Sequence, residues 1–159
     1  MKSIRPFLAF LALAASIVTI YGFSQDEGKV DRKQLRDMLV QLGYEVKDIV
    51  TTPGKEKYSA NFNRDGLDIP IGYEISPSGS YIWLTVNLGD APDDASPKNA
   101  ALLRQNGKIQ PSQFYVTEAT KRLMAATPVE NKGITNALLR QRSESLAGTV
   151  GSTKEIWQK

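Results

Sequence analysis

The spacing of the hydrophobic residues changes along this chain and divides it into three parts. An uncharged apolar run extends from Phe7 to Ile20. Apolar residues then follow the 3.6-residue period of a helix over residues 35–42, and the two-residue period of strands from Tyr44 to Leu88. This order predicts an amino-terminal apolar segment, a helix, and then a strand-rich region.

Local signals set the bounds of the first helix at about residues 32–42. Asp31 stands where a carboxylate can accept hydrogen bonds from the amides of the opening turn, and Gln34 completes the spacing of a capping box. Gly43 supplies a helix stop. We expect the apolar stripe of this helix to pack on a sheet.

Turn signals divide the following region into four expected strands, with breaks at Thr52-Pro53-Gly54, Asn63-Arg64-Asp65-Gly66 and Ser76-Pro77-Ser78-Gly79. In the fourth strand the aliphatic face is formed by Ile82, Leu84, Val86 and Leu88. The side chains that point the other way are those of Tyr81, Trp83, Thr85 and Asn87. This second face has two aromatic side chains with no predicted cover.

The carboxyl-terminal half predicts a helix, two short strands and a long final helix. Ser96 and Pro97 open the first of these helices, the strands are expected near residues 113–117 and 121–126, and Thr135 is expected to cap the last helix. The order α-β-β-β-β-α-β-β-α predicts an α+β domain. We expect an antiparallel sheet of about five to six strands with the helices packed on one face.

The end of the chain carries one further helix signal. Ser152 and Glu155 have the spacing of a capping box, and they come just before Ile156 and Trp157. We therefore expect Ser152 to cap a short terminal helix.

Three short segments and a closing region together carry a family resemblance. They are LVQLGY at 39–44, YIWLTVNL at 81–88, ALLRQN at 101–106 followed by Phe114, and a closing region with Val129-Glu130-Asn131, Ile134-Thr135, Leu138-Leu139 and Trp157. With these segments the chain resembles, over roughly residues 30 to 157, the type III secretion chaperone-like fold, in the YbjN-like group of bacterial proteins. This resemblance implies a small non-enzymatic protein, often a dimer, that holds another polypeptide.

The apolar run near the amino terminus has the organisation of an export signal, because basic residues precede it and the sequence turns polar at Ser24. We expect cleavage after Ser24. Residues 1–24 are then a signal peptide, residues 25–30 a polar lead-in and residues 31–159 a single α+β domain, in the periplasm or secreted. The alternative is an uncleaved membrane anchor, because the segment from Phe7 to Phe23 has seventeen residues, the lower edge of the roughly 17 to 25 that can span a bilayer.

Charge and composition exclude several classes of function. Loss of Lys2 and Arg5 with the signal lowers the formal charge from +3 to +1, which gives no electrostatic reason to expect nucleic acid binding. The sequence has no histidine and no cysteine, so the usual general base, the thiolate nucleophile and most metal ligand sets are missing. No glycine-rich phosphate loop is present. We expect no catalytic residues, no cofactor and no metal, and therefore no enzyme.

Two acidic groups leave a weaker alternative open. Asp90, Asp93 and Asp94 could bind calcium, but they lack the ligand spacing of a calcium loop and are interpreted as a solvated turn. Asp65 and Asp68 could act as a carboxylate pair, yet they stand where a hairpin turn is expected. A carboxylate-dependent hydrolase therefore ranks last.

The candidate partner-binding residues are Tyr81, Trp83, Tyr115 and Trp157. On an uncovered sheet face such side chains form an apolar patch of the kind that commonly marks interfaces. The alternative is that a helix or the carboxyl-terminal tail covers Tyr81, Trp83 and Tyr115, and that Trp157 is an aromatic anchor for the tail. We expect an exported, chaperone-like module that binds a protein or peptide through a sheet face or edge and that can form a homodimer. The runner-up is a small-molecule or lipid binder with a cleft between the sheet and the final helix.

Overall fold

The computed structural model describes residues 28–158, so the expected signal peptide and the start of the lead-in lie outside the described residues. Six strands form one antiparallel sheet in the order β1-β2-β3-β4-β6-β5. The strands are β1 Lys47–Val50, β2 Lys57–Arg64, β3 Leu67–Ile75, β4 Tyr81–Asp90, β5 Gln113–Val116 and β6 Arg122–Glu130. The helices are α1 Arg32–Gln41, α2 Pro97–Asn106, α3 Asn136–Ser152 and α4 Lys154–Trp157. The predicted α+β class and order of elements are confirmed.

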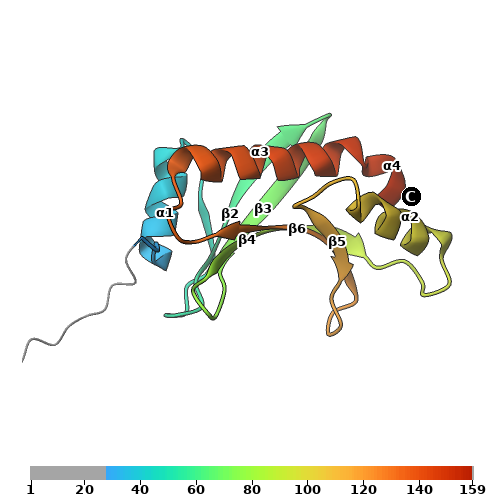
Figure 1. Cartoon of the computed structure of the whole chain (residues 1–159), viewed down its shortest axis with the longest axis horizontal. Helices are drawn as coiled ribbons and strands as arrows, with labels where there is room; N and C mark the ends of the chain where they lie inside the picture. The colour runs from blue at the N-terminus through green and yellow to red at the C-terminus, as the bar shows by residue number, and fades with distance from the viewer. Residues whose placement is uncertain (1–27, 159) are drawn as a thin grey trace, which may run out of the picture.

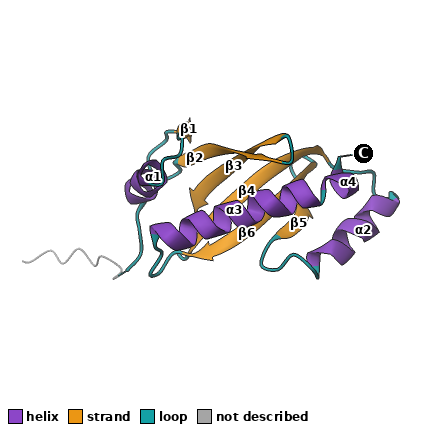
Figure 2. Ribbon diagram, turned by 90° about the horizontal axis from the view of Figure 1, so that it is seen from above, coloured by secondary structure: helices purple, strands orange, loops and turns teal. Residues whose placement is uncertain are grey.

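The helices lie on one side of the sheet. α3 runs along that face, and α1 and α2 lie near its two ends (Figures 1 and 2). None of the elements that the structure describes covers the opposite face (Figure 1). The prediction that the helices gather on one face is therefore confirmed.

The hydrophobic core fills the space between α3 and the sheet. Ile71 and Leu84 are buried on the sheet side, and Leu139, Leu146 and Val150 are buried on α3. α1 and α2 add Leu35, Leu39 and Leu102. Each such side chain contributes about 1.5–3 kcal/mol when it is fully removed from water. Burial on this face is thus the main stabilising contribution to the fold.

One polar pair is enclosed in this core. The Tyr73 hydroxyl donates to Ser143 Oγ at 2.8 Å, and the Ser143 hydroxyl donates to Leu139 O at 2.8 Å. Both hydroxyl groups therefore have partners, which offsets the cost of burying them. Burial raises the pKa of Tyr73 well above its ordinary value of 10.0, so this phenol stays neutral at physiological pH.

Local sequence signals place several element ends correctly. The expected capping box of α1 is present, because Gln34 N–H donates to Asp31 Oδ1 at 2.7 Å and Asp31 N–H donates to Gln34 Oε1 at 2.8 Å. Asp65 and Gly66 have φ angles of 52° and 74°, as the two-residue turn between β2 and β3 requires. Thr135 caps α3 as expected, through a hydrogen bond from Leu138 N–H.

The carboxyl-terminal end differs from the prediction. Ser152 does not cap the last helix, because α3 continues through it and its hydroxyl donates to Thr149 O at 3.2 Å. Thr153 is the first cap residue of α4 and makes no side-chain capping bond. The predicted capping box of Ser152 and Glu155 is therefore wrong, since a helical serine finds an acceptor in the turn that precedes it.

β6 is longer than the sequence indicates. It extends to Glu130 rather than ending near Ala126, and it pairs with β4 along its whole length. This long central ladder places the end of β6 beside the start of β4.

A buried asparagine ties the start of the domain to this part of the sheet. Asn131, which is 1% exposed, accepts from Val30 N–H at 3.2 Å and donates to Val30 O at 3.0 Å and to Gly79 O at 2.9 Å. Lys29 and Lys132 form an isolated antiparallel bridge next to it. The first described residues therefore lie beside the turn between β3 and β4.

Over residues 28–158, no helix combines the length and the apolar character that a bilayer crossing requires.

Candidate functional site

The uncovered face of the sheet carries the alternate side chains of every strand. The register aligns Glu74, Trp83 and Pro128 in one row across β3, β4 and β6. The prediction that Tyr81 and Trp83 point away from the helices is confirmed by the pattern of burial in β4, where Ile82 and Leu84 are the buried residues. We call the side chains of Tyr81, Trp83, Tyr115, Met124 and Pro128 the aromatic face.

Tyr81 and Trp83 occupy the end of the aromatic face where β4 begins. Tyr81 is 46% exposed and pairs with Glu130 across the ladder, whereas Trp83 is half-buried between its neighbours in the sheet. A large side chain that is only partly buried retains apolar surface that a partner can remove from water. Both residues therefore remain accessible on a face that no helix covers.

Tyr115 lies on the same face, two strands away from Trp83. Its partner in β6 is Met124, which is four residues from Pro128, so Tyr115 and Trp83 are offset by roughly 13 Å along the strands. Tyr115 is 37% exposed. Burial raises the pKa of the Tyr115 phenol, and the negative charge of Glu74 raises it further.

Ala126 shows that the aromatic face is partly closed by its own side chains. It stands between Thr85 of β4 and Gln113 of β5 in the register, on the side that no helix covers, and yet it is fully buried. Bulky side chains in the neighbouring rows must therefore shield it from solvent. The aromatic face is thus a packed surface rather than a set of separate residues.

A charged groove adjoins Trp83. Its cavity of about 470 Å³ is lined by Trp83, Ile75, Ser76 and Pro77, by Gly54, and by the charged residues Arg32, Lys55, Glu56, Lys57 and Glu74. Lys57 forms an ion pair with Glu74, and Arg32 Nε lies 3.3 Å from Glu56 Oε2. These two pairs leave the charge of Lys55 in excess. The groove therefore combines apolar walls with a mildly basic rim.

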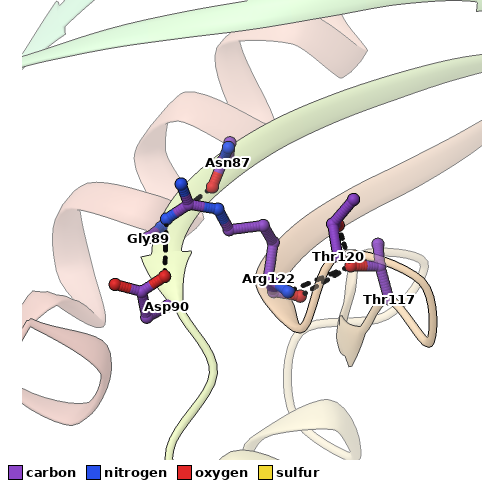
Figure 3. Close-up of polar contacts among 6 residues, drawn as sticks. All are labelled: Asn87, Gly89, Asp90, Thr117, Thr120 and Arg122. Atoms are coloured by element: carbon purple, nitrogen blue, oxygen red, sulfur yellow. Dashed lines mark hydrogen bonds and ion pairs between the residues drawn. The ribbon is translucent and has the colours of Figure 1, made fainter.

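Polar contacts link the end of β4 to the β5–β6 turn, at the opposite end of β4 from Tyr81 (Figure 3). Arg122 Nη1 donates to Asp90 Oδ1 at 2.7 Å, and Arg122 N–H donates to Thr117 Oγ1 at 3.0 Å. The Thr117 and Thr120 hydroxyls are 2.6 Å apart, and Gly89 N–H donates to Asn87 Oδ1 at 3.0 Å. These bonds hold the β5–β6 turn and the end of β4 together.

Trp157 does not join the other candidate residues. It lies in α4, in the helical layer, where its indole Nε1 donates to Val150 O at 2.9 Å and its ring packs against the hydrophobic core. The structure therefore places Trp157 as an anchor of the carboxyl-terminal tail, while Tyr81, Trp83 and Tyr115 share one face.

The acidic candidates are divided between loops and strands, because Asp65, Asp93 and Asp94 lie in connecting segments whereas Asp68 and Asp90 lie in β3 and β4. Asp65 lies in the hairpin turn between β2 and β3, and Asp68 accepts a hydrogen bond from Asn63 Nδ2 at 3.1 Å. The backbone carbonyls of Asp93 and Asp94 accept from the Asn99 side chain. In the part of the chain that the structure describes, no group of three or more acidic side chains is placed to hold a metal ion.

The corner between α2 and β5 carries exposed apolar side chains that the sequence did not single out. Leu103 is 72% exposed and Val116 is 42% exposed. With Tyr115 they border a cleft of about 130 Å³, whose other lining residues are Asn99, Leu102, Asn106, Phe114 and Leu123. The adjacent pair Leu102-Leu103 gave only a weak sequence signal for this exposure. Successive residues on a helix lie roughly 100° apart, yet the adjacent Leu146 and Ala147 of α3 are both buried.

The outer edge of β5 is closed by a side chain from this corner. Asn106, the last residue of α2, accepts from Phe114 N–H at 2.7 Å and donates to Phe114 O at 3.0 Å. A strand added to β5 would make the same two kinds of bond with the Phe114 backbone. The Asn106 amide therefore occupies the position of a further strand and protects this edge.

Comparison with known proteins finds similarity in structure only. No protein-family model matches the sequence, and no curated protein matches it. The fold is similar to that of a chain in the structure of the HopA1–SchA chaperone–effector complex, with 13% sequence identity and a TM-score of 0.52, over 82% of this chain and 99% of that chain. The expected resemblance to a type III secretion chaperone therefore holds for the fold.

Proposed function

We propose that this chain is an exported, non-catalytic module of the bacterial cell envelope that holds a protein or peptide on its aromatic face. The observation that carries this proposal is the uncovered face itself, on which Tyr81, Trp83 and Tyr115 remain accessible. Aromatic side chains are enriched at protein interfaces because they bury a large area and lose little conformational entropy.

The shape and charge of the site favour a polypeptide as the ligand. The aromatic face extends over β4, β6 and β5, and the groove beside Trp83 adds a rim with an excess positive charge at Lys55. An extended segment with apolar and acidic side chains fits such a surface better than a compact small molecule does. The likeness in fold to a chain of a chaperone–effector complex supports the same partner class.

The proposal also includes the cellular location, the YbjN-like grouping and the oligomeric state that the sequence suggests. Residues 1–24 direct export, and cleavage after Ser24 releases the domain into the periplasm or the medium. Mass spectrometry of the mature amino terminus tests this step, and an intact Met1 would support a membrane anchor instead. Self-association of the domain is the third component, and sedimentation analysis measures it directly.

The binding role is tested by crosslinking and affinity capture from native envelope extract. The full chain and its Trp83→Ser variant are used as baits, and we expect a specific polypeptide that the variant fails to retain. Val40→Ser is the matched control, because Val40 is an exposed apolar residue of α1, at 49%, and lies outside the aromatic face. This control should retain the partner.

The other outcomes have distinct meanings. Equal capture by the wild type and Trp83→Ser would remove the aromatic face from the proposal. An empty bait, together with thermal stabilisation by a lipid or small molecule, would favour the runner-up. α3 packs directly on the sheet through fully buried Leu139 and Leu146, so the ligand would then have to bind away from that interface.

A further inference from the structure

We propose that the groove beside Trp83 binds the carboxyl terminus of the partner polypeptide, with the terminal carboxylate at Lys55 and the last apolar side chain against Trp83. This inference rests on the proposed function, since it names the part of the partner that the groove receives. The two can fail separately, because capture that depends on Trp83 can succeed while a preference for a chain end is absent.

The floor of the groove is one cross-strand row of the sheet. The register aligns Lys57 of β2 with Glu74 of β3, and Glu74 with Trp83 of β4. Lys57 is the first residue of β2, and Ile75, the last residue of β3, also lines the groove. The groove therefore lies at the margin of the sheet, where a segment bound on the aromatic face reaches the limit of its supporting strands.

The charges of the groove cancel except at one side chain. Its lining has three basic and two acidic side chains, which are Arg32, Lys55, Lys57, Glu56 and Glu74. The two acidic side chains pair with Arg32 and Lys57. Over residues 28–158, the Lys55 ammonium takes part in no ion pair, and Lys55 is exposed. One positive charge is thus available to a ligand at this place.

A hydrogen-bonded turn fixes the backbone of Lys55. The Lys55 N–H donates to Thr52 O at 2.9 Å, which closes a four-residue turn. Pro53 and Gly54 occupy its two central positions, and Gly54 has a φ of 81°. A proline followed by a residue with positive φ is typical of a type II turn. The backbone that carries this cation is therefore ordered before a ligand arrives, which lowers the entropic cost of binding.

A single free cation beside an apolar wall matches an apolar carboxylate. Trp83, Ile75 and Pro77 form the wall. A phosphate group would bring about two negative charges against one free ammonium. The groove volume of about 470 Å³ lies within the range of roughly 300–1,000 Å³ that is usual for ligand pockets. The ligand group is therefore a carboxylate with a large apolar group next to it.

The carboxyl terminus of a polypeptide presents these two groups together. The terminal carboxylate and the last side chain are attached to the same Cα, so both can enter one groove. In an extended segment, the residues on either side of an internal acidic residue point to the opposite face, and the next side chain on its own face lies roughly 7 Å away. An apolar terminal residue therefore fits the groove better than an internal acidic residue does.

Fluorescence polarisation with the full chain and two labelled peptides tests this site. Both peptides have the sequence Gly-Ser-Gly-Leu-Phe with fluorescein at the amino end, and they differ only in a free carboxyl terminus or a carboxamide. We expect the wild type to bind the free acid about fivefold more tightly than the amide. Salt should reduce this difference, because the Lys55 ammonium is exposed.

Three variants separate the charge of Lys55 from other effects. Lys55→Met removes the ammonium and should abolish the preference for the free acid, whereas Lys55→Arg should retain it. Lys108→Met is the matched control, because Lys108 is also exposed and lies outside the groove, beyond the end of α2. This control should bind both peptides as the wild type does.

Equal affinities of the wild type for the acid and the amide, or a preference that survives in Lys55→Met, would overturn the carboxylate site. The absence of binding of either peptide up to millimolar concentration would overturn it as well. Tighter binding of dodecanoate than of the free-acid peptide would assign the groove to a lipid instead. In each of these cases, capture of a polypeptide by the wild type but not by Trp83→Ser would still establish the binding role.

Discussion

The two faces of the sheet differ in what their side chains contact. On one face, Ile82 and Leu84 of β4 are fully buried under α3. On the other face, Tyr81 and Trp83 of the same strand have no helix over them. Adjacent residues of β4 therefore alternate between core packing and an uncovered position, because successive side chains of a strand point in opposite directions.

This difference suggests that the fold and the binding surface can be altered separately. The face under α3 supplies the burial that stabilises the domain, whereas the aromatic face retains apolar area that a partner can cover. Substitutions at neighbouring positions of β4 should accordingly affect different measurements.

The largest expected effect contrasts Leu84 with Trp83. Leu84→Ala should lower the free energy of unfolding by about 2–5 kcal/mol, because it leaves a cavity in the core. Trp83→Ser should lower it less, by about 1–2 kcal/mol, because the indole is only partly removed from water in the folded state. Urea unfolding followed by circular dichroism measures both, and similar losses for the two variants would contradict the separation of roles.

Alkaline pH should weaken the core face through Tyr73. The folded state binds the Tyr73 proton more tightly than the unfolded state, because burial raises the pKa of this phenol above its ordinary 10.0. This contribution to stability is fully present below pH 10 and is lost as the pH rises above that value toward the folded-state pKa.

Urea unfolding of the wild type and of Tyr73→Phe between about pH 8 and about pH 11 measures this linkage. The unfolding free energy of the wild type should fall more steeply than that of the variant. Parallel pH profiles would show that Tyr73 is not the group responsible.

A smaller effect is expected at Tyr115. Glu74→Gln should lower the pKa of Tyr115, because it removes the negative charge that disfavours ionisation, although burial of the ring remains. Ultraviolet titration of Glu74→Gln, with Glu74→Gln/Tyr115→Phe as the reference, isolates this one phenol. An unchanged pKa would mean that Tyr115 and Glu74 do not approach each other across the face.

The smallest effect concerns Gly72 of β3, which pairs with Thr85 and lies on the uncovered face of the sheet. A Cβ at position 72 would lie 3.0 Å from Thr85 Oγ1, which is a tight approach. Gly72→Ala should therefore change stability by less than about 0.5 kcal/mol, whereas in a Thr85→Ala background it should stabilise by about 0.4–1 kcal/mol. Equal effects in the two backgrounds would rule out this close contact.

Most features that depend on neighbouring residues in the sequence were predicted well, although the capping box at Ser152 and Glu155 was not. The capping box at Asp31 and Gln34, the hairpin turn at Asp65 and Gly66, and the cap at Thr135 are formed within a few residues and need no knowledge of the rest of the fold. The two-residue period likewise assigned the two sides of β4, because alternation is a property of the strand itself.

Features that depend on how distant elements pack were missed. The exposure of Leu103 and the bond between Asn106 and Phe114 depend on where α2 crosses the end of the sheet, and no local pattern specifies that crossing. For Trp157 the sequence left open a partner contact or an anchor of the tail, and the position of α4 in the helical layer favours the anchor. The candidate site was thus predicted in part, with three of four aromatic residues on one face.

The hydrogen bonds of Asn131 determine how the domain would carry a mechanical load. A pull on the amino terminus reaches Val30, whose backbone is bonded to Asn131, and from there it passes to Gly79 and to the adjoining ends of β6 and β4. The force therefore enters the longest strand ladder of the sheet before it reaches α1. A tether at this end would hold the domain by its most extensively paired strands, with Tyr81 beside the point of attachment.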